Sequence, residues 1–221
     1  MINFTDITGL ASSTVAVTAL VVMLPGVARL QRHHFALLVC AIAIVVLIPF
    51  GGLPLAAYVR GWMGDLSITS LLLLLLLTIL RPVCGLSLHT PSPTGGGLGW
   101  GNARSKYTLL SMIALAALGL YPMVLGIGYF DPYRLGYGNP WFMGGLLLLA
   151  LAAAIRQLPL AALAIALAVL AWGVGWYESN NLWDYLIDPL LAIYAIGALV
   201  KQGMQTLWKL RRGQVRITSK N

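Results

Sequence analysis

The chain has 221 residues, of which 59% are hydrophobic and only 9% are charged, and its formal net charge is +8. Soluble domains carry about 25% charged residues, so this composition excludes a surface that faces water on all sides. We therefore expect the folded chain to be surrounded mainly by lipid.

Apolar runs of helical length follow one another along the chain. A helix needs about 20 apolar residues to cross the roughly 30 Å hydrocarbon layer, and backbone groups in lipid must be paired within the segment. Seven segments fit this rule, although the second, third and fifth are short and need flanking residues. They predict an all-α integral membrane protein, a bundle of about seven transmembrane helices at residues 8–28, 35–50, 66–80, 107–129, 141–155, 158–177 and 185–200.

The amino terminus reads MINFTDITGL and carries Asp6 where a secretory signal would carry Lys or Arg. We expect it to remain in the protein as the first transmembrane helix. Cys40 and Cys84 fall at different depths of the predicted bundle. No disulfide is therefore expected.

The basic residues orient this bundle, because Lys and Arg are retained on the cytoplasmic side. An external N-terminus and a cytoplasmic C-terminus place twelve of the fourteen basic residues inside, and leave only Arg60 and Arg134 outside. All six acidic residues then lie on or near the outer face. This asymmetry predicts a multi-pass protein of a cell membrane, and the topology suits a bacterial inner membrane.

Residues 1–221 are expected to form a single transmembrane domain. Two of its segments are expected to lie outside the membrane helices. Residues 81–106 are rich in Gly, Pro and Ser, which predicts a flexible cytoplasmic loop. Residues 201–221 form a basic cytoplasmic tail. Because the tail directly follows a membrane helix, its expected partners are anionic membrane lipids and not nucleic acid.

The sequence carries no pattern typical of a cofactor or metal site. His33 and His34 lie in a basic interfacial stretch, and His89 lies in the glycine-rich loop, so no set of zinc or haem ligands is expected. The run GGGLGWG lacks the Gly-Lys-Ser/Thr ending and the strand–helix context of a phosphate-binding loop. We therefore predict neither a metal nor a cofactor.

Charged and aromatic residues gather in three connections that share the predicted outer face. These are PLAAYVRGWMGD, FDPYRLGYGNPW and WYESNNLWDYLID. Arg can hold a carboxylate or phosphate by two parallel hydrogen bonds, and aromatic rings can flank sugars or lipid headgroups. The candidate binding residues are Arg60, Asp65, Asp131, Tyr133, Arg134, Trp141 and Trp183. Trp and Tyr are also common anchors at membrane interfaces, which is the structural alternative for the aromatic residues.

The third connection carries the candidate catalytic carboxylates Glu178, Asp184 and Asp188. A helix that begins near Asn181 would place Asp184 and Asp188 on one face, four residues apart. Asp188 lies inside the seventh apolar segment, where a carboxylate needs a partner, so we expect it to contact Arg60 or Arg134. In the alternative interpretation Asp188 and Pro189 simply begin a helix.

Three functions are compatible with these observations. The first is an accessory or binding subunit that docks an envelope protein partner, favoured because the chain lacks a recognisable catalytic motif. The second is a membrane enzyme acting on a lipid-linked or carbohydrate substrate, with Glu178 or Asp184 as general base, Asp188 as an orienting acid, and Arg60 and Arg134 holding an anion. The third is a small transporter, which would need polar groups across the bilayer.

Overall fold

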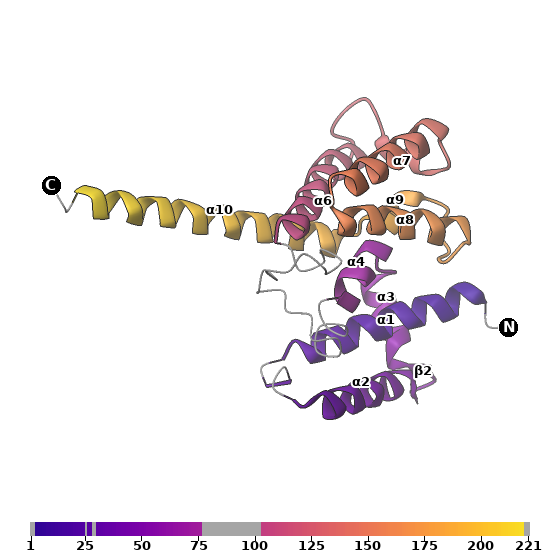
Figure 1. The fold of residues 1–221 in the computed structure, drawn as a ribbon. Coiled ribbons are helices and arrows are strands. Elements are labelled where there is room, and N and C mark those ends of the chain that lie inside the picture. The colour runs from indigo at the N-terminus through magenta and orange to yellow at the C-terminus, as the bar shows by residue number, and fades with distance from the viewer. Residues whose placement is uncertain (1–2, 25, 28–29, 77–102, 219–221) are drawn as a thin grey trace.

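The protein is mostly helical, which fits the predicted all-α class (Figure 1). The structure is a computed structural model that describes residues 3–24, 26–27, 30–76 and 103–218. It is 77% helical. Three of its helices, Phe4–Val22, Ser105–Val124 and Pro189–Trp208, are long and apolar enough to cross a membrane.

The N-terminal third forms one group of helices. Helix α1 (Phe4–Val22) packs against α2 (Arg32–Leu47) and against the short α3 (Leu55–Met63). Between α2 and α3 the chain makes a small hairpin of β1 (Pro49–Phe50) and β2 (Leu53–Pro54). Gly51 and Gly52 form its two-residue turn with φ of +66° and +99°, a conformation that favours glycine at both positions.

The remaining helices form a second group, and α4 (Ile68–Leu74) joins the two because it packs against both α1 and α8. The second group contains α6 (Ala103–Val124), α7 (Pro140–Ile155), α8 (Pro159–Gly173) and α10 (Pro189–Thr218). Two short elements lie in its connections, the 3-10 helix η3 (Pro132–Gly136) and α9 (Leu182–Leu186). The 3-10 helix η3 contacts α6 and α9, and α9 also contacts α4 and α8.

Helix α8 lies at the centre of this second group, and small side chains form its buried face. Ala161, Ala164, Ala168 and Ala171 recur every three or four residues and are at most 8% exposed. Side chains this small let the backbones of α4, α6 and α7 approach closely and increase the dispersion contacts between the helices.

Each of the seven predicted segments contains a described helix, but several boundaries differ from the prediction. Helix α6 begins at Ala103, so residues 103–106 are helical instead of belonging to the predicted loop. The rest of that loop that precedes residue 103 lies outside the described residues. Helix α10 continues without a break from the predicted seventh segment to Thr218, so most of the predicted tail is helical. Lys, Arg and Gln favour helix, and no proline or glycine pair interrupts this stretch.

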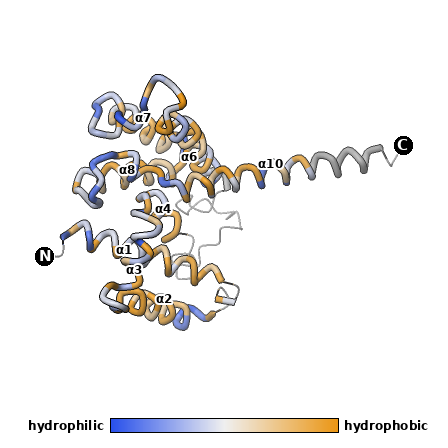
Figure 2. The backbone as a smooth tube through the Cα atoms, turned by 180° about the vertical axis from the view of Figure 1, so that it is seen from behind, coloured by the Kyte–Doolittle hydropathy of each residue, from blue (hydrophilic) through white to orange (hydrophobic). Residues whose placement is uncertain are grey.

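The polar connections gather at one end of the molecule. In Figure 1 the N-terminus lies at this end, whereas α10 extends to the opposite end. Figure 2 shows hydrophobic stretches along the helices and more hydrophilic ones near helix ends. The connections that contain α3, η3 and α9 are joined by direct hydrogen bonds, described below. They form the candidate site.

Candidate functional site

Arg60 of α3 is the centre of an ion-pair cluster. Its Nε and Nη2 atoms donate to the two carboxylate oxygens of Asp65 at 2.7 and 3.0 Å. Its guanidinium also lies 3.5 Å from Asp6 and 3.4 Å from Glu178. The hydrogen bond to Asp65 raises the pKa of Arg60, and all three carboxylates add to this effect. Arg60 therefore ties the start of α1, the α3–α4 connection and the α8–α9 connection together.

The neighbours of Arg60 explain how it reaches this position. Gly64, at φ +73°, ends α3 and turns the chain so that Asp65 folds back on Arg60. Gly9 of α1 leaves space for the guanidinium, because a Cβ atom at that position would collide with the Nε and Cζ atoms of Arg60. With three carboxylates around it, the Arg60 guanidinium is not left open for an anionic ligand. An anion-holding role for Arg60 has no geometric support.

Asp188 is buried, and it joins two helices instead of pairing with an arginine. One carboxylate oxygen accepts from the backbone N–H of Leu191 at 2.8 Å and so caps α10. The other accepts from the backbone N–H of Ser67 at 3.0 Å, from its hydroxyl at 2.8 Å, and from the hydroxyl of Ser70. Asp188 makes no ion pair within the described part of the chain, so the expected contact with Arg60 or Arg134 is wrong. The N-terminus of α4 provides the donors that we had expected from an arginine, and Arg60 is held by the nearer Asp65.

Asp184 and Asp188 do not share one helix, which corrects the second expectation. Helix α9 ends at Leu186, Ile187 is extended with φ −143° and ψ 135°, and α10 begins at Pro189. Pro189 accounts for the separation, because helices usually end at or before the residue that precedes a proline, and proline is favoured at the first turn of the next helix. The second interpretation of this pair, a helix start, is therefore the one observed.

Asp184 accepts hydrogen bonds from two hydroxyl groups. The Tyr133 hydroxyl lies 2.9 and 3.0 Å from its two oxygens, and the Ser179 hydroxyl lies 2.5 Å from one of them. Burial and then the hydrogen bond to Asp184 raise the pKa of Tyr133, so Tyr133 keeps its proton and acts as the donor. This bond joins η3 to α9.

Asn181 and Trp183 complete the contact between η3 and α9. The fully buried Asn181 donates to the Tyr133 carbonyl at 2.9 Å and caps α9 through the backbone N–H of Trp183 at 3.0 Å. The Trp183 indole donates to the Pro132 carbonyl at 3.0 Å. Gly136 makes this close approach possible, because a Cβ atom there would collide with the Asn181 side chain. From the sequence Asn181 is expected only near the start of a helix, and an Asn directly before a helix is a typical cap.

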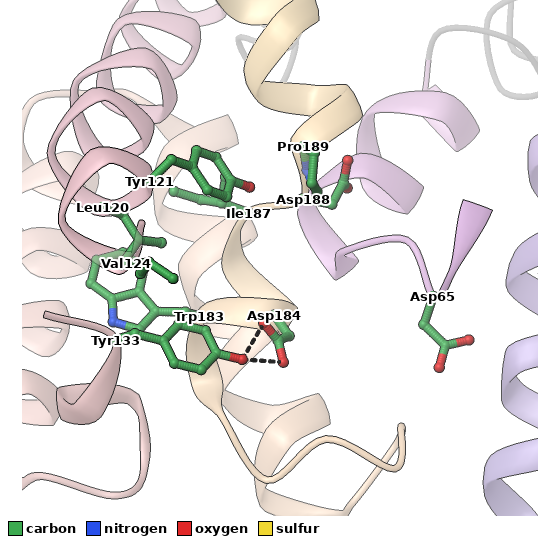
Figure 3. Close-up of a pocket in the computed structure, with 10 residues that line it drawn as sticks. All are labelled: Asp65, Leu120, Tyr121, Val124, Tyr133, Trp183, Asp184, Ile187, Asp188 and Pro189. Carbon is green, nitrogen blue, oxygen red and sulfur yellow. Dashed lines mark hydrogen bonds between the residues drawn. The ribbon is translucent and has the colours of Figure 1, made fainter. Parts of the chain in front are cut away.

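A pocket of about 190 Å³ lies among these groups (Figure 3). Figure 3 shows the Tyr133 ring beside Asp184, and the Tyr121 hydroxyl on the same side as Asp188. Three of the lining residues are carboxylates, and three are aromatic. The lining consists of Asp65, Leu120, Tyr121, Val124, Tyr133, Trp183, Asp184, Ile187, Asp188 and Pro189. Five of the predicted site residues therefore meet at one pocket, and Tyr121 is a lining residue that the sequence analysis missed because it lies within an apolar helix.

The other predicted site residues lie away from this pocket. Asp131 caps η3 by accepting from the backbone N–H of Tyr133 at 3.0 Å. Trp141 is 87% exposed in the first turn of α7. Arg134 is exposed and makes no ion pair with any described residue. Their assignment to substrate binding stays a prediction.

The described residues contain no group of three or more His, Cys, Asp or Glu side chains placed to hold a metal ion. No protein family, curated protein or solved structure matches this chain. The interpretation of the pocket therefore depends on its own geometry and charge.

Proposed function

We propose that this chain is a multi-pass protein of a cell membrane that acts as an accessory or binding subunit of a cell-envelope system. In this proposal the helices α1, α2, α4, α6, α7, α8 and α10 provide seven crossings, with the N-terminus and the pocket outside and the C-terminus in the cytoplasm. The separation of acidic from basic residues along the sequence supports this orientation. Helices α2, α7 and α8 have 16, 16 and 15 residues, and α4 has only 7, so all four would need flanking residues or a locally thinner bilayer.

The observation that carries the binding function is the way the pocket's carboxylates are held. Asp65 is paired with Arg60, Asp184 accepts from Tyr133 and Ser179, and Asp188 accepts from four donors. Such a fixed arrangement is suited to holding a ligand or a partner group in one orientation.

Copurification tests this function. The tagged protein is extracted in a mild detergent, and every protein and lipid that copurifies is identified by mass spectrometry for the wild type, Asp184→Asn and Glu178→Gln. Asp184 lines the pocket, whereas the Glu178 side chain is 68% exposed at the same end of the molecule and lies outside it. We expect a stoichiometric partner or specific lipid that Asp184→Asn loses and Glu178→Gln retains. Isolation of the wild type without a specific companion would contradict a subunit function.

An enzyme acting on a lipid-linked or carbohydrate substrate is the second candidate, and one observation favours it. Asp184 and Asp188 line the same pocket in different environments, because Asp188 accepts from four donors while Asp184 accepts from two hydroxyl groups. Two carboxylates in different environments can divide acid and base roles. Under this proposal Asp184 is the reacting group, and Asp184→Asn would abolish turnover of a substrate found by copurification.

The topology has its own test. Single cysteines at Glu178 and at Gln202, in a background without Cys40 and Cys84, are labelled with a membrane-impermeant maleimide in intact cells. We expect labelling at position 178 and protection at position 202 until the cells are opened. Labelling of both positions in intact cells would exclude the proposed orientation.

A further inference from the structure

The charge of the pocket indicates which class of ligand it can take. Of its three carboxylates, only Asp65 has a cationic partner, Arg60. Asp184 and Asp188 make no ion pair with any residue that the structure describes. Two carboxylates in one hollow lower the local electrostatic potential, which concentrates cations and repels anions. A phosphate or another carboxylate is therefore excluded as the group that enters.

The aromatic and aliphatic side chains that line the pocket restrict the class of ligand further. Tyr121, Tyr133 and Trp183 line the pocket together with the aliphatic Leu120, Val124 and Ile187. A hydrated metal ion prefers several oxygen ligands and gains no favourable contact from such apolar side chains. An organic ammonium group gains from both features, because it is attracted to carboxylates and to the faces of aromatic rings. The volume of about 190 Å³ corresponds to about six water molecules, enough for one small head group but not for a large ligand.

We propose that the pocket binds a small organic cation, an ammonium head group, with Asp184 and Asp188 as counter-charges and the rings of Tyr121, Tyr133 and Trp183 as walls. This inference depends on the proposed binding function and names the chemistry of its ligand. The ammonium group can belong to a free amine or to a lipid head group, because the pocket distinguishes only their shared chemistry.

Calorimetry on the purified full-length chain in detergent tests this inference. The probe is tetramethylammonium chloride, with sodium chloride at equal ionic strength and glucose as the uncharged, hydroxyl-rich comparison. We expect saturable binding of tetramethylammonium alone. Asp184→Asn should weaken it at least about tenfold by removing a counter-charge, whereas Glu178→Gln should change it less than about twofold, because that exposed charge lies outside the pocket.

A second variant distinguishes a loss of the ligand site from a folding defect in Asp184→Asn. Tyr121→Leu removes one aromatic wall and leaves the hydrogen bonds of Asp184 in place, and it should also weaken the binding of tetramethylammonium. Binding of glucose instead of tetramethylammonium, equal effects of Asp184→Asn and Glu178→Gln, or no binding of either probe would each overturn the ammonium assignment. None of these results affects the subunit function, which is tested by copurification.

Discussion

Asp188 offers the sharpest test of the structure, because one buried side chain caps α10 and also binds the first turn of α4. Asp188→Ala removes the acceptor for two backbone N–H groups, those of Ser67 and Leu191, and for the hydroxyls of Ser67 and Ser70. Each lost cap costs about 1 kcal/mol, and a buried N–H left without a partner costs about 1–3 kcal/mol. Removal of a buried charge offsets part of this cost. We expect a net loss of about 3 kcal/mol of unfolding free energy.

Asp188→Asn should lie between the wild type and Asp188→Ala. The amide oxygen of Asn can still cap Leu191, but its NH₂ group would face the N–H of Ser67, which is also a donor. The expected loss is about 1–2 kcal/mol.

Thermal and denaturant unfolding in detergent measures these losses, and Asp131→Ala is the matched control. Asp131 also caps a short helix, but it accepts from the backbone N–H of Tyr133 alone and is only partly buried. Its loss should cost less than about 1 kcal/mol. A cost for Asp188→Ala no larger than that of Asp131→Ala would refute the architectural role of Asp188.

Three further predictions concern close approaches and exposed charge. Gly9→Ala should lower the free energy of unfolding by about 1–3 kcal/mol, because the new Cβ displaces Arg60 from its carboxylates. An equal loss of unfolding free energy in Gly9→Ser would support this explanation. An unchanged melting temperature of Gly9→Ala would contradict it. Gly136→Ala should lower the free energy of unfolding by a similar amount, because it displaces the buried Asn181 from its two partners. Hydrogen exchange should show faster opening of the contact between η3 and α9. Unchanged exchange there would contradict this explanation. Glu178→Gln should change unfolding by less than about 0.5 kcal/mol, because the Glu178 side chain is 68% exposed; a larger loss would mean that its ion pair with Arg60 is screened from solvent.

The sequence by itself determined the class of the molecule and the region where its polar groups gather. The all-α fold follows from apolar runs of helical length, because such runs must pair their backbone groups internally in lipid. Five of the ten candidate residues line one pocket, and the connections that carry them do meet. The helical character and the meeting of these connections could be read from the sequence, because they depend on composition and on the spacing of residues along the chain.

The tertiary structure decided which partner each charged group takes. Arg60 binds Asp65, Asp6 and Glu178 instead of Asp188, because a glycine turn brings Asp65 back and Gly9 lets the guanidinium lie against α1. Tyr121 joins the pocket from within an apolar helix. These contacts depend on the relative placement of helices far apart in the sequence, and hydrogen-bond donors from several of them compete for each carboxylate. The spacing of residues along the chain does not determine which donor binds each carboxylate.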